Sequence, residues 1–275
     1  MKKIFQIMMI ILALGVVIFC GSRLLAARQG YQASRDVYED AASQFTKPAV
    51  SGGRENVPQA GGDHSYTYSE ANERDSELDQ PPITVDFKSL ASVSDNVIGW
   101  IYCEDTVINY PIVCGVDNEY YLERDYRGNF DPGGSIFSDA ANIKGFVDSN
   151  IILYGHHMPD MSMFATLKYW QDQDYYNKHP VMWILTPEQN YRMELFSAYP
   201  TSAISDTYSI FRSPGPELEQ YLQFVVNNST IRTSVELDPY AKYVVLSTCA
   251  YRDEIARTVL HGKLVPADAA PISKG

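Results

Sequence analysis

The residue best suited to covalent chemistry is Cys249, which ends the β-forming run VVLSTC. Arg257 opens the next such run, RTVLHGKL, and His156 follows the apolar run IILYG. A cysteine nucleophile needs a partner that holds the thiolate, a donor for the developing oxyanion and an accessible site. Arginine stays protonated near neutral pH, so Arg257 can serve as a donor or a substrate clamp but not as a base. These three residues could therefore supply a cysteine nucleophile, its partner and an oxyanion donor.

Other readings of the cysteines are weaker. Taken alone, a cysteine in a β-run is more often a buried core thiol. Cys20 lies in an apolar N-terminal segment, which leaves Cys103, Cys114 and Cys249, an odd number, in the rest of the chain. A predicted hairpin with its turn near residues 104–106 would separate Cys103 from Cys114 by roughly 20 Å, too far for a disulfide. No CxxC or HxxxH spacing indicates a metal site, and the proposed chemistry requires no cofactor.

The N-terminus predicts a membrane anchor. Residues 4–22 are almost entirely apolar and follow two lysines. Such a helix is about 28 Å long, which is about one hydrocarbon core. The LLAAR that follows is a poor signal-peptidase site, and Phe19 before Cys20 does not suit a lipoprotein. We expect an uncleaved single-pass anchor over residues 1–27 at the cell membrane, with the remaining chain extracellular.

Composition divides the rest of the chain in two. Residues 28–82 are polar and rich in Gly, Ser and acidic residues towards their end, which predicts a stalk or linker that is partly helical or disordered. Residues 83–275 hold the apolar runs and are the predicted catalytic domain.

The net charge of −12 argues against a nucleic-acid partner, because the chain offers no basic surface for phosphates.

Within residues 83–275, short β-rich runs alternate with short helical segments. At least seven strands are expected, among them a hairpin formed by 180–186 and 191–201. Helices are expected at residues 85–94, 117–126, 162–179 and 215–229. This pattern favours a closed or nearly closed β-barrel decorated by helices over a regular βαβ array.

The motif LSTC, with Arg257 in ARTVLHGKL and with NIILYGHHM upstream, resembles the sortases, which are membrane-anchored cysteine transpeptidases of Gram-positive bacteria. VIGWIY, INYPIVCGVDNEYYLERDYRG and GGSIFSD are similar to segments of class B, and the similarity covers residues 84–266. It implies a mainly β fold: a closed eight-stranded barrel with N-terminal helices and a long helix before the cysteine-bearing strand. Val245 stands where the family has Thr, and Cys114 where it often has Gln.

The resemblance also implies roles for individual residues. Cys249 matches the nucleophile, His156 the histidine and Arg257 the arginine of the family. Arg252 is a rival for the last role, but it falls in the predicted loop, whereas Arg257 begins a strand. His157 is expected to be a neighbour that shapes the site. The residues expected near the substrate are Ser247, Tyr154, Asn109, Val113 and the backbone N–H of Ala250.

The implied reaction is cleavage of a C-terminal sorting motif after Thr and transfer of the acyl group to an amine of the cell wall or of a pilin. The partners would be a sorting-motif protein, either NPQTN-like or LPxTG-like, a peptidoglycan precursor or lysine amine, and the membrane. Two alternatives remain open. One is a secreted cysteine peptidase that hydrolyses its acyl-enzyme. The other is an anchored binding module with no enzymatic activity.

Overall fold

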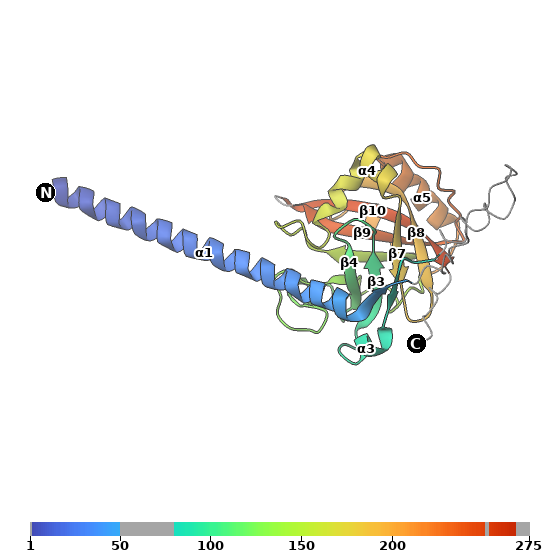
Figure 1. Cartoon of the computed structure of the whole chain (residues 1–275). Coiled ribbons are helices and arrows are strands. Elements are labelled where there is room, and N and C mark those ends of the chain that lie inside the picture. Colours follow the sequence, from blue (N-terminus) through green and yellow to red (C-terminus); the bar gives the residue numbers. More distant parts are fainter. Residues whose placement is uncertain (1, 50–79, 251–252, 268–275) are drawn as a thin grey trace, which may run out of the picture.

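The computed structural model describes residues 2–49, 80–250 and 253–267, with the backbone alone at residues 2–4, 249–250 and 253–255. One helix, α1 (Lys2–Phe45), projects far from the domain (Figure 1). Its apolar N-terminal half is exposed, whereas Ser34, Tyr38, Ala41 and Phe45 are buried. Spacings of three and four residues put these four side chains on one helical face. Residues 34–45 therefore belong to the packing of the domain.

A small two-stranded sheet follows the helix. β1 (Thr46–Pro48) pairs antiparallel with β2 (Ile83–Val85), and the backbone N–H of Ala49 donates to the Pro82 carbonyl at 2.8 Å. Ala49 and Pro82 thus lie side by side, and the C-terminal end of α1 is held against the domain. The boundaries predicted at residues 27 and 82 remain a prediction.

Eight strands close into a barrel, as the sequence resemblance implied, in the order β10-β8-β7-β3-β4-β5-β6-β9. The pairs β4–β5 and β6–β9 are parallel, and the other pairs are antiparallel. The strands are β3 (Val97–Tyr102), β4 (Asn109–Cys114), β5 (Ile136–Ser138), β6 (Asn150–Gly155), β7 (Val181–Leu185), β8 (Asn190–Ser202), β9 (Lys242–Ala250) and β10 (Asp253–Ala267).

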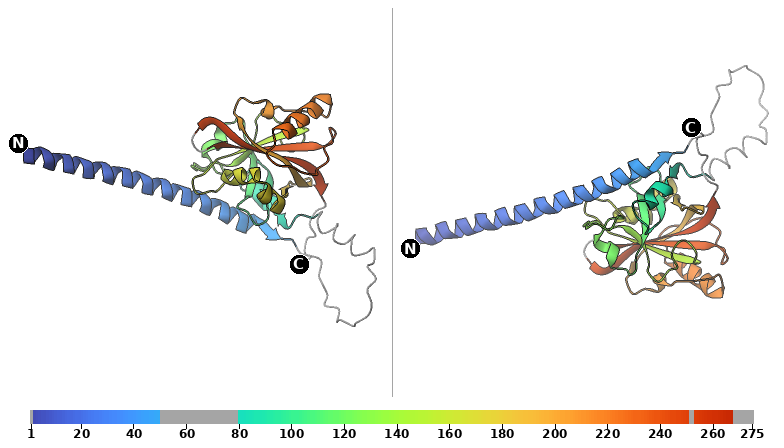
Figure 2. Two further views of the ribbon diagram at one scale, coloured as in Figure 1. Left: turned by 90° about the horizontal axis from the view of Figure 1, so that it is seen from above. Right: turned by 90° about the horizontal axis from the view of Figure 1, so that it is seen from below.

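Five short helices connect the strands: α3 (Phe87–Ala91), η1 (Tyr120–Glu123), η2 (Ala165–Gln171), α4 (Gln173–Lys178) and η3 (Asp206–Tyr208). A longer helix, α5 (Pro216–Asn228), precedes β9. The long helix expected before the cysteine strand is α5, and it lies on the opposite side of the barrel from α1 (Figure 2). The helix predicted at 117–126 was wrong in extent, since only one 3-10 turn forms there. Asp125 explains its end, because its carboxylate accepts the backbone N–H groups of Arg127 and Asn129 and bends the chain.

The strand β9 shows how the barrel is packed. Val244 and Leu246 point into the barrel core, and Tyr243 and Val245 point to a second apolar cluster. α5 covers this second cluster with Leu218, Tyr221, Leu222 and Val225, all buried. Both faces of β9 are therefore covered, which explains its continuous apolar sequence. A strand held on both faces and both edges is a rigid support for the residues at its end.

Candidate active site

The ends of β6 and β9 and a facing residue of β10 bring the predicted catalytic residues together; β10 begins at Asp253, so Arg257 does not begin the strand as predicted. β6 and β9 are parallel neighbours, and their last registered pair is Gly155 with Thr248. The next residues along these two strands are His156 and Cys249. On the other edge of β9, Cys249 is paired with Arg257 of β10. The backbone therefore places His156, Cys249 and Arg257 side by side at one end of the barrel.

For Cys249 and Ala250 the structure describes the backbone in β9 and not the side chains. Arg252, the rival of Arg257, lies outside the described residues. Arg257 itself is half-buried and reaches the cavity described next.

A cavity of about 310 Å³ lies over these strand ends, and we call it the donor cavity. Four of the residues predicted from the sequence line it: Tyr154, His156, Ser247 and Arg257. The other lining residues are Asn118, Leu122, Phe137, Gly155, Ala203, Tyr208 and Thr248. The volume suits a short extended peptide segment with part of its surface left in water.

The ring of His156 has a defined hydrogen bond. Its Nε2 lies 2.7 Å from the carbonyl oxygen of Leu122. A carbonyl can only accept, so Nε2 carries the proton and Nδ1 is the basic nitrogen of the neutral ring. Burial lowers the pKa of His156, against smaller opposing effects of the Leu122 carbonyl, Glu123 and Asp131. The ring is thus a neutral base whose charged form is assisted by nearby acceptors and carboxylates.

A buried carboxylate supports the wall of the donor cavity. Tyr154 Oη donates to Asp139 Oδ2 at 2.8 Å, and Asn118 Nδ2 donates to the same oxygen at 3.1 Å. Burial first, and then the Asp139 charge, raise the pKa of Tyr154, while Arg257 opposes them. Tyr154 is therefore a neutral donor, and Asp139 positions two lining side chains. Asp139 ends the class B-like segment GGSIFSD, and that segment was the available signal for it.

Ser247 has a partner that sequence reasoning also missed. Its Oγ lies 2.9 Å from Tyr208 Oη, and the Tyr208 ring stacks on Tyr154 with centroids 6.2 Å apart. Tyr208 belongs to η3, far from the cysteine motif in sequence, so no local signal marks it. Asn118 and Leu122 do lie within the class B-like segment INYPIVCGVDNEYYLERDYRG, and that segment was the available signal for them.

Two predicted substrate residues lie away from the donor cavity. Val113 is fully buried in the barrel core, so its side chain has no surface to offer a substrate in this structure. Asn109 accepts a hydrogen bond from Trp100 Nε1 at 2.7 Å and lines a different cavity, of about 220 Å³, between α1 and the barrel.

Cys103 is a poor rival for Cys249. Cys103 and Cys114 are free thiols. Cys103 is buried, and burial raises its pKa to about 12, which keeps it protonated and unreactive at neutral pH. Within the described part of the chain, no group of three or more His, Cys, Asp or Glu side chains could hold a metal ion.

The chain shares 37% identity over 185 residues with "Sortase B" of Listeria monocytogenes, covering 66% of this chain and 74% of that protein. The chain belongs to the sortase B family. "Sortase B" of Staphylococcus aureus is 30% identical over 188 residues, covering 68% of this chain and 77% of that protein. A comparison with protein-family models gave no match.

Solved structures agree with this membership. The crystal structure of Staphylococcus aureus sortase B superposes with a TM-score of 0.66 at 26% identity, covering 85% of this chain and 99% of that one. A sortase B from Bacillus anthracis gives 0.67 at 30% identity, covering 86% and 99%. The chain is thus a sortase-type cysteine transpeptidase. This membership removes the alternative of a binding module with no enzymatic activity.

Proposed function

We propose that this sortase B-family enzyme cleaves a C-terminal sorting motif after its Thr and joins the new acyl end to an amine. The Cys249 thiolate attacks the Thr carbonyl, and Arg257 with the Ala250 N–H holds the oxyanion. His156, which becomes imidazolium by taking the proton of the Cys249 thiol, protonates the leaving amine and later takes a proton from the acceptor amine. The observation that carries this proposal is the register that sets His156 and Arg257 on either side of Cys249.

The donor cavity supports the assignment of the sorting motif to this end of the barrel. Tyr154 and Ser247 line it with polar groups that are already hydrogen-bonded, and Phe137 adds apolar surface. A Staphylococcus aureus sortase B–substrate complex superposes on this chain with a TM-score of 0.63 at 30% identity, covering 66% of this chain and 85% of that one. By this similarity we assign the donor cavity to a sorting-motif peptide. The acceptor in our proposal is an amine of the cell wall or a pilin lysine.

We further propose that α1 anchors the enzyme in the cell membrane with the barrel outside. Within the described residues, the stretch Phe5–Phe45 is one helix that is long and apolar enough over part of its length to cross a membrane. Its exposed apolar half has no protein surface to pack against in this structure. A single span would place the barrel next to its cell-surface substrates.

Peptide cleavage tests the proposed function directly. The full chain in detergent is incubated with NPQTN-like and LPxTG-like peptides, with and without an added amine, and the products are identified by mass. We expect cleavage after Thr, an amide product with the amine, and loss of both in Cys249→Ala. Arg257→Ala should lower the rate by about a hundredfold or more, as for loss of an oxyanion donor. Hydrolysis alone at every amine concentration would instead identify a peptidase, and full activity in Cys249→Ala would refute the mechanism.

A further inference from the structure

A second groove meets the donor cavity at His156. This groove has a volume of about 660 Å³, and we call it the acidic groove. Its lining shares only His156 and Leu122 with that of the donor cavity. The other lining residues are Asp117, Glu119, Tyr120, Glu123, Arg124 and Phe130. The ring of His156 thus stands between two separate binding spaces.

The charge of this groove is negative. Three carboxylates and one guanidinium line it, which is a net charge of −2 when His156 is neutral. Arg124 lies over the Tyr120 ring, 4.8 Å from its centroid, and donates to the Gly128 carbonyl at 3.3 Å. Glu119 and Glu123 are exposed, and the charge of Glu123 acts on His156. The carboxylates therefore face water beside the ring that must accept a proton during acyl transfer.

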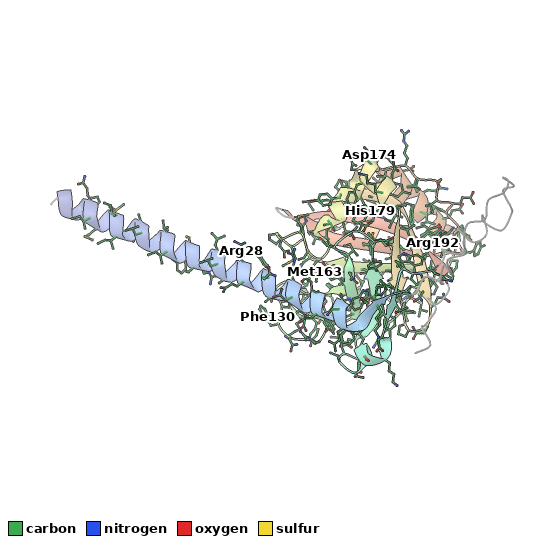
Figure 3. All side chains as sticks on the ribbon, viewed as in Figure 1. Arg28, Phe130, Met163, Asp174, His179 and Arg192 are labelled. Carbon is green, nitrogen blue, oxygen red and sulfur yellow. The ribbon has the colours of Figure 1, made fainter. Side chains whose placement is uncertain are left out.

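The groove also offers apolar surface. Tyr120 is 41% exposed and Phe130 is 73% exposed. Phe130 lies on the side of the domain from which α1 extends (Figure 3), and Pro132 lies against Gly30 of that helix. A ligand with a methylene chain and a cationic end would pack its chain on these rings and place its charge near the glutamates.

We propose that the acidic groove is the acceptor site of the transpeptidation and that it selects a primary amine carried on a cationic, lysine-like chain. This inference rests on the proposed function, because it assigns the second substrate of the same reaction. Two substrates must reach one acyl carbon, and two spaces that adjoin at the proton-transfer residue satisfy that need. The donor cavity then holds the thioacyl chain while the acidic groove presents the amine.

The bound ammonium first gives one proton to water, and the transfer step then balances with the groups of the site. The neutral amine nitrogen forms a bond to the acyl carbon, and the C–S bond breaks with its electron pair returning to Cys249 as thiolate. The nitrogen loses one proton, which passes to neutral His156. Glu123 stabilises the imidazolium that results, because opposite charges nearby favour the charged form. Glu119 acts earlier, by raising the local concentration of a cationic acceptor.

Acceptor kinetics test the assignment. The full chain in detergent is given a saturating sorting peptide and either Nα-acetyl-lysine amide, which is cationic, or hydroxylamine, which is neutral at pH 7.5. In Glu119→Gln we expect the KM for the lysine amide to rise about two- to fivefold at low ionic strength and less at high salt. The KM for hydroxylamine and the cleavage rate without amine should stay as in the wild type. Glu188→Gln removes an exposed charge that does not line the groove and is the matched control.

A wild type that cleaves and transfers normally, with equal lysine-amide KM in Glu119→Gln and Glu188→Gln, overturns the acceptor site and leaves the proposed function standing. A wild type that cleaves no sorting peptide overturns both. Glu119→Lys sharpens the result, since reversing the charge must raise the lysine-amide KM beyond the effect of Glu119→Gln.

Discussion

Removing one hydroxyl tests how the donor cavity is supported. In Tyr154→Phe the ring keeps its contacts with Phe137 and Tyr208, whose centroids lie 5.4 and 6.2 Å away, but the bond to Asp139 is lost. Asp139 is only 8% exposed, so little water can replace the lost donor. A hydrogen bond to a charged group contributes about 1.5–3 kcal/mol. We therefore expect the free energy of unfolding to fall by about 2 kcal/mol, which is roughly 4–8 °C in Tm for a domain of this size.

The assay is equilibrium urea unfolding in detergent, followed by tryptophan fluorescence. Tyr240→Phe is the control, because Tyr240 is 77% exposed. A double-mutant cycle with Asp139→Asn isolates the charge, since an amide still accepts a bond from the hydroxyl. In that background Tyr154→Phe should cost about 1 kcal/mol, the usual value for a neutral bond. The reasoning is refuted if Tyr154→Phe matches Tyr240→Phe, or if its cost is unchanged by Asp139→Asn.

Two further predictions concern the core and the strand end. His261 is buried, and burial lowers its pKa to about 3, so the unfolded chain gains a proton below about pH 6.5 that the folded chain does not. The contribution of His261 to the free energy of unfolding should be constant above pH 6.5 and fall below it by up to about 1.4 kcal/mol per pH unit. Urea unfolding between pH 7 and 5 measures this dependence, and the free energy of unfolding should vary less with pH in His261→Leu than in the wild type. An equal dependence on pH in both proteins would contradict the prediction. In Gly155→Ala the new Cβ would lie 2.5 Å from a side-chain atom of Ile136 and 2.7 Å from one of Phe164. We therefore expect the free energy of unfolding to fall by about 1–3 kcal/mol and peptide cleavage to become slower. Gly215→Ala is the control, because a Cβ added there would meet no other side chain or backbone within 4 Å. Equal stabilities of the two variants would show that the packing around Gly155 can adjust.

Much of the fold was predictable because its signals are local. The helical spacing of the apolar residues in α5 predicted both the helix and its buried side, which carries Leu218, Tyr221, Leu222 and Val225. The hairpin of β7 and β8 was likewise predicted from two β-rich runs around PEQN. The helix predicted at 117–126 did not form over its full length. The Asp125 carboxylate accepts hydrogen bonds from nearby backbone N–H groups, and these bonds outweigh the helical spacing of the apolar residues.

The candidate site was predictable only in part. Cys249, His156 and Arg257 could be proposed because each stands at the end or start of an apolar run, and their roles remain predictions. Tyr208 and Asp139 could not be found this way, because hydrogen bonds between distant segments bring them to the cavity. Val113 was predicted from the family resemblance, and the barrel core encloses its side chain; its role near the substrate stays a prediction.

By itself the sequence determined the apolar N-terminal helix, the types of most elements and the presence of a thiol, an imidazole and a guanidinium at the borders of apolar runs. These depend on residues close together in the chain, whose periodicity and chemistry are readable locally. Only the tertiary structure decided that β6 lies parallel to β9, that residues 34–45 of α1 pack on the barrel, and that two cavities adjoin at His156. Such neighbours are chosen by burial and pairing across the whole chain, and no local pattern encodes them.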